Sequence, residues 1–211
     1  RFVSSHEVGH TLGLPHNFAS SYAYPVDSLR SASFTSKMGT APSIMDYARF
    51  NYIAQPEDKG VALMPNIGIY DKYAIAWGYR PILDAKTPED ELPTLRRWIE
   101  EKNGDPLYRY GRQGNPNDYT AQSEDLGDDA MRASNYGIEN LKRIMKNLRD
   151  WTYVEGSDYS ELEEMYGEVR SQFNRYMGHV GRYVGGVKED YKTADQDGMV
   201  YTHAPKAKQK E

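Results

Sequence analysis

Mostly apolar positions near the end of the chain recur at alternating steps of three and four residues. The first set comprises Met131, Ser134, Ile138, Leu141, Met145 and Leu148. The second set comprises Leu162, Tyr166, Val169, Phe173, Tyr176, Val180 and Tyr183. This spacing is typical of the seam between two packed helices. It predicts an antiparallel helical hairpin that turns at Gly156 to Asp158, with Ser160 and Glu163 as a capping box. We expect the seam residues, and His179 beside them, to be structural.

Helical spacing also predicts two shorter helices before this hairpin. Residues 69–79 form one, and residues 88–103 contain the other, which Asn103-Gly104 ends. Residues 17–68 show little alternation and are rich in Ser, Pro, Gly, Asn and Tyr, which predicts a long functional loop. Four aromatic residues of this loop either line a substrate cleft or pack beneath the loop: Phe18, Tyr22, Tyr24 and Phe34.

Two polar segments lack a strong periodicity. Residues 105–119 read as a loop in which 107–110 alternate enough to form a short edge strand. The chain after Gly185-Gly186 is polar, and we expect it to run extended along the surface with disordered last residues.

Composition narrows the class of function. The 211 residues are 38% hydrophobic and 27% charged, with 18 tyrosines and a net charge of −5. This charge, without a long basic run, argues against nucleic acid or an anionic membrane as partner. The absence of cysteine excludes disulfides, thiol catalysis and cysteine zinc sites. No apolar run approaches the roughly 20 residues of a membrane span.

Three of the five histidines lie within eleven residues near the start of the chain, in the pattern H-E-x-x-H-x-x-G-x-x-H. His6 and His10 are four residues apart, so on a helix both imidazoles lie on one face and can bind one metal ion. Gly13 can adopt a left-handed conformation that ends the helix, and the chain can then return His16 to the same ion. Three ligands with one open position are typical of a catalytic zinc site.

Glu7 is expected to be the general base of this site. It is rotated by about 100° from His6 on a helix, so it does not join the same ligand set. Zinc lowers the pKa of a bound water to about 7, and a carboxylate beside that water can take its proton during attack on a carbonyl. The same carboxylate can pass the proton to the leaving amine.

A second motif, Ser43-Ile-Met-Asp-Tyr47, follows downstream, and with it the chain resembles the metzincin zinc endopeptidases. The resemblance implies that Met45 forms the Met-turn beneath the zinc, where Met38 is a competing candidate with less suitable neighbours. It implies that Tyr47 is an extra metal ligand or a donor to the oxyanion. The wording of both motifs is most similar to the met-zincin domains of large exported bacterial proteins, which implies an extracytoplasmic location. Astacins usually have an acidic residue directly after the third histidine, and this chain has Asn17 at that position.

The resemblance also implies how the chain is organised. We expect a mainly α protein with long irregular loops: the C-terminal subdomain of a metzincin-like fold in residues 1–81, a transition segment in 82–125, and the helical hairpin and tail in 126–211. In metzincins an upstream sheet pairs with the extended substrate, and we expect that sheet to belong to a part of the polypeptide before Arg1.

Without that sheet, the first helix should expose apolar side chains, among them Val3, Val8 and Leu12. We expect the upstream part of the polypeptide, or a second copy of the chain, to cover them.

These features predict a zinc metalloendopeptidase whose substrate is a peptide or protein. One alternative is a zinc peptidase in which Glu57 or a later glutamate replaces His16 as third ligand. Another is a metal-binding or interaction module without turnover. The acidic segment 123–129 is a candidate Ca²⁺ site, but it lacks EF-hand spacing, and we favour the interpretation that Asp128 or Asp129 caps the next helix.

Overall fold

The computed structural model describes residues 2–112 and 115–211, so residues 113 and 114 of the predicted loop 105–119 lie outside the described part. The described chain is mainly helical, as predicted, and its one sheet has two short strands. The N-terminal half contains α1 (Phe2–Thr11), η1 (Ser21–Ala23), η2 (Val26–Arg30), α2 (Ala32–Met38), α3 (Ile69–Tyr79) and α4 (Pro88–Glu100). The C-terminal half contains η3 (Pro106–Tyr108), α5 (Ala130–Trp151), α6 (Ser160–Gly181), β1 (Val187–Glu189), β2 (Tyr201–His203) and α7 (Lys206–Lys210).

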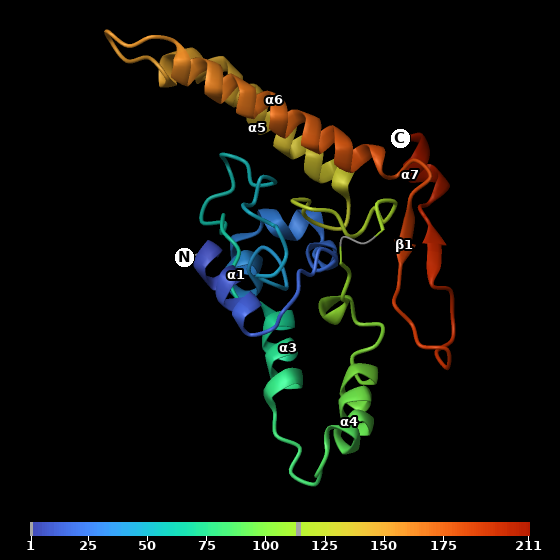
Figure 1. Cartoon of the computed structure of the whole chain (residues 1–211). Coiled ribbons are helices and arrows are strands. Elements are labelled where there is room, and N and C mark those ends of the chain that lie inside the picture. The colour runs from blue at the N-terminus through green and yellow to red at the C-terminus, as the bar shows by residue number, and fades with distance from the viewer. Residues whose placement is uncertain (1, 113–114) are drawn as a thin grey trace.

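Helices α5 and α6 form the predicted antiparallel hairpin, whose turn projects far from the rest of the chain (Figure 1). At its base Tyr176 is buried and packs closely on Gly137, where a Cβ would overlap its ring. Three predicted seam residues are exposed, Met145, Tyr166 and Phe173, at 43%, 51% and 42%, whereas Leu148 near the turn is buried at 4%. The seam is thus confirmed at its buried and half-buried positions and wrong at these three, which the two helices leave exposed.

The main core joins segments that are far apart in the sequence. Tyr52 of the long loop packs on Tyr176 of α6 with ring centroids 4.8 Å apart, and its hydroxyl accepts a hydrogen bond from the Leu126 backbone N–H at 3.1 Å. The other buried members of this core are Tyr24, Val26, Leu29, Ala41, Ala48, Ile53, Ala133 and Leu141. The loop 17–68 and the base of the hairpin therefore share one core.

The long loop is mostly irregular, as predicted, but η1, η2 and α2 interrupt it. Three of its four singled-out aromatic residues pack beneath the loop. Phe18 and Tyr24 are buried, and Phe34 packs edge-on against Tyr24 with ring centroids 5.0 Å apart. Tyr22 is half-buried and packs on Tyr119.

Two local predictions in the later chain are wrong because side-chain caps compete with them. The predicted edge strand at 107–110 is largely the short helix η3, since the Asp105 carboxylate accepts a hydrogen bond from the Leu107 N–H. The predicted capping box at Ser160 does not form. Asp158 instead accepts hydrogen bonds from the N–H and hydroxyl of Ser160. The helix predictions at 69–79 and 88–103 are confirmed by α3 and α4.

The polar tail is more ordered than predicted. Strands β1 and β2 pair antiparallel, with Val187 opposite His203. Helix α7 then brings Lys208 into an ion pair with Asp129 at the start of α5, and Arg96 of α4 pairs with Asp195 in the tail. Within the described residues, no helix is both long and apolar enough to cross a membrane.

Candidate metal centre

His6 and His10 lie on helix α1, and a backbone carbonyl holds the Nδ1 atom of each ring. The Nδ1 of His6 donates to the Ile44 carbonyl at 2.8 Å, and the Nδ1 of His10 donates to the Leu14 carbonyl at 2.9 Å. A carbonyl can only accept, so each Nδ1 carries a proton, and in the neutral form of each ring Nε2 offers a lone pair. This is the orientation that metal-binding histidines require.

The chain after α1 reverses at Gly13, whose φ of 81° lies in the left-handed region that glycine adopts without strain. The reversal brings Nε2 of His16 to 3.2 Å from Nε2 of His6 and 3.0 Å from Nε2 of His10. Tetrahedral zinc with Zn–N bonds of 2.0–2.1 Å separates its ligand nitrogens by about 3.3 Å. The histidine set therefore fits one zinc ion, with little adjustment.

The charge state of His16 also suits a cation. Burial and the nearby His10 and His6 hold the pKa of His16 below its usual value. A neutral imidazole is the form that binds metal, so binding requires no proton to be displaced from this ring at neutral pH. Among the described residues, one group of three or more potential metal-binding side chains has its ligand atoms within 4.8 Å of one another. It consists of His6, His10 and His16.

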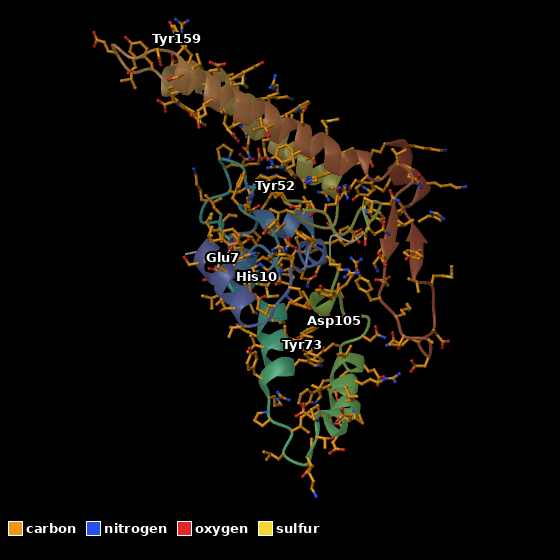
Figure 2. All side chains as sticks on the ribbon, in the orientation of Figure 1. Glu7, His10, Tyr52, Tyr73, Asp105 and Tyr159 are labelled. Atoms are coloured by element: carbon orange, nitrogen blue, oxygen red, sulfur yellow. The ribbon has the colours of Figure 1, made fainter. Side chains whose placement is uncertain are left out.

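Glu7 lies between the two α1 histidines in sequence but on the exposed side of the helix (Figure 2). Its carboxylate makes no hydrogen bond or ion pair with the part of the chain that the structure describes. It is therefore free to contact a water or substrate beside the histidines.

The segment Ser43 to Tyr47 forms a buried turn beneath the histidines. Asp71, in the first turn of α3, accepts hydrogen bonds from the Ser43 hydroxyl at 2.6 Å, the Ile44 N–H at 2.8 Å and the Gly68 N–H at 2.7 Å. Because the Ile44 carbonyl holds His6, this carboxylate positions the His6 ring through one intervening residue. Sequence reasoning missed Asp71, since nothing local relates residue 71 to residue 6.

Met45, the predicted Met-turn methionine, lies buried against α1. It is 1% exposed, and its sulfur lies directly against Gly9 of α1. Tyr47 packs its ring on those of His16 and His6, with centroids 4.5 and 5.3 Å apart. The structure thus brings both predicted Met-turn residues to the histidines.

Gly9 is a second residue that sequence reasoning missed, although it lies inside the first motif. A Cβ there would overlap the Met45 sulfur. We expect Gly9→Ala to destabilise the protein by about 1–3 kcal/mol, because the buried methionine must move, and to weaken zinc binding. Urea unfolding of the metal-free protein and a zinc competition assay would measure both effects.

Gly167→Ala is the matched control, since this glycine lies inside α6 with no atom near a built Cβ. Alanine should stabilise that helix by about 0.5–1 kcal/mol. Equal effects of the two substitutions would contradict the close packing of Gly9 on Met45.

Asn17 connects the third histidine to the second half of the chain. It is wholly buried, its Nδ2 donates to the Arg109 carbonyl at 2.9 Å, and its Oδ1 accepts from the Gly111 N–H at 2.9 Å. Its own N–H donates to the Met45 carbonyl at 3.1 Å. A carboxylate could not donate to Arg109, which explains why an amide stands here instead of an acidic residue.

The alternative ligands lie elsewhere. Glu57 is exposed and pairs with Arg30 at 2.8 Å, which leaves His16 as the third member of the set. In the acidic segment, Asp129 caps α5 by accepting from two backbone N–H groups, as predicted. Asp128 accepts from the Val26 N–H, and Glu124 pairs with two arginines, so these carboxylates have separate partners.

The model of the family described as Met-zincin matches residues 1–211. No curated protein and no solved structure matches the chain.

Proposed function

Because the chain belongs to the Met-zincin family, we propose that it is a zinc-dependent metallopeptidase that hydrolyses internal peptide bonds. One observation carries this proposal: three imidazole Nε2 atoms converge at the spacing of tetrahedral zinc ligands, and two of them have their Nδ1 protons held by carbonyls. Buried structural histidines do not need three lone pairs facing one another, whereas a cation stabilises that arrangement.

His6, His10 and His16 would hold the ion. A bound zinc ion supplies a Lewis acid that polarises the scissile carbonyl and lowers the pKa of a water to about 7. The carbonyls of Ile44 and Leu14 keep the first two rings in the required orientation. Gly13 and Asn17 fix the chain on either side of the third.

Glu7 would take the proton of the attacking water and return it to the leaving amine. Its exposure on α1 leaves the carboxylate accessible to both. Tyr47, packed on His16 and His6, would donate its phenolic proton in a hydrogen bond to the oxygen that becomes negative in the transition state. The substrate would be a peptide or protein, and we place the reaction outside the cytoplasm on the strength of the exported-protein resemblance.

The proposal is tested by metal content and peptide cleavage on the same preparation. We expect about one zinc ion per chain, cleavage of an unfolded protein, loss of both after chelation and their return when zinc is added. His10→Ala should lose both, whereas His203→Ala, at an exposed position in β2, should keep both. One zinc per chain without any cleavage would reject the peptidase and favour a metal-binding module.

A further inference from the structure

A second feature lies beside the metal centre and takes no part in it. Residues 19–23, the end of α4, η3 and the tail at 188–196 enclose a cavity of about 670 Å³, a volume in the range of ordinary ligand sites. Tyr73 and Asp105, which flank it, are labelled below Glu7 and His10 in Figure 2. The ion pair between Arg96 and Asp195 joins the tail to α4 near this cavity.

Tyrosines dominate the apolar lining of this cavity. Tyr73 packs edge-on against Tyr108 with ring centroids 5.1 Å apart, and Tyr110 lies 6.0 Å from Tyr191. Burial raises the pKa of Tyr73 and of Tyr110, so both hydroxyls stay protonated and can donate. Rings that offer a flat face and a donor suit a polar chain such as a peptide.

The charge of the lining is opposite to that of the protein. The whole chain is net negative, yet five cationic side chains line the cavity against two carboxylates. Arg109 and Lys188 lie beside Asp190, at 3.3 and 2.9 Å, which compensates part of that charge. The other three cations form no ion pair with a carboxylate in the described residues: Lys102, Arg112 and Lys192.

A short, hydrogen-bonded segment of the chain connects the cavity to the histidines. Ala19 lines it and is three residues beyond His16, so its Cα lies within about 11 Å of that of His16. Gly111, next to the lining residues Tyr110 and Arg112, donates to Asn17 and accepts from the Ala19 N–H. An extended peptide covers that distance with about three to four residues.

We propose that this cavity binds an acidic stretch of the peptide whose cleavage occurs at the histidines. The cleavage step in this inference rests on the proposed function. The binding of an acidic peptide to the cavity can be measured without turnover. Its uncompensated cations supply the attraction, and its tyrosines supply stacking faces and hydroxyl donors.

The probe is a fluorescently labelled peptide rich in aspartate and glutamate, compared with the same peptide carrying asparagine and glutamine. Anisotropy should show the acidic peptide binding at least about tenfold more tightly, with an advantage that falls as ionic strength rises. In the double variant Lys102→Glu and Arg112→Glu this advantage should be lost. The double variant Lys146→Glu and Arg149→Glu, an equal change of charge at exposed positions of α5, should keep it.

Cleavage of the two peptides separates this inference from the proposed function. If both hold, the acidic peptide should have the lower KM and a similar kcat, and the Lys102/Arg112 variant should raise only that KM. Selective binding without cleavage would support the cavity and reject the peptidase. Cleavage without preference for the acidic peptide, or a preference that survives in the Lys102/Arg112 variant, would overturn the inference.

Discussion

Replacing Glu7 by glutamine is expected to lower kcat for peptide hydrolysis by about 10²–10⁴-fold, the usual contribution of a general base. Glutamine keeps the size of the side chain but cannot accept the proton. Because Glu7 is exposed and bonds to nothing in the described chain, the variant should fold normally. Zinc content, KM and the thermal midpoint should therefore stay close to those of the unmodified protein.

The measurement is steady-state cleavage together with zinc analysis on the same preparation. Glu164→Gln is the control, because this glutamate is also exposed on a helix and lies on α6, away from the histidines. Unchanged kcat in the Glu7 variant would reject Glu7 as the base. Loss of zinc with loss of activity would instead assign Glu7 a role in holding the metal.

Replacing Asp71 by alanine is expected to cost on the order of 3 kcal/mol or more in stability, because it leaves the Ser43 hydroxyl and the Ile44 and Gly68 N–H groups without their buried acceptor. The substitution should also act on the histidines. The Ile44 carbonyl that holds His6 loses its support, so zinc affinity should fall about 10–100-fold. Urea unfolding and zinc competition would report the two effects.

The chain offers a matched control in Asp90. It too is the third residue of its helix and accepts from preceding backbone N–H groups, but it is exposed on α4. Asp90→Ala should lower stability only slightly and leave zinc binding unchanged. If the two variants lose zinc affinity equally, the link from Asp71 through Ile44 to His6 is wrong.

The sequence predicted the histidine arrangement and two of the helices, which depend on local geometry. The four-residue spacing of His6 and His10 determines that they share a helix face, and Gly13 provides the conformation that returns His16. Helices α3 and α4 follow from their apolar spacing and their ends in the same way. In each case the interacting residues lie within a few turns of one another.

Contacts between distant segments were not predictable from one sequence. Asn17 bonds to Arg109 and Gly111 through groups that any buried amide would offer, so nothing at residue 17 indicates its partners.

The predicted edge strand at 107–110 was wrong because the Asp105 cap of η3 outweighed a weak alternation of apolar and polar residues. The seam of the hairpin was wrong at Met145, Tyr166 and Phe173 because spacing indicates which side of a helix is apolar, not whether anything covers it.

The packing of Tyr52 on Tyr176 has a consequence for the order in which the protein assembles. During synthesis the histidine motif emerges well before α6, whereas the loop that contains Met45 reaches its full packing only when α6 has been made. The Leu126 N–H that bonds to Tyr52 is also late. Under the proposed function, the hydrolytic centre would mature only after α6 has been synthesised, which protects the nascent polypeptide from its own activity.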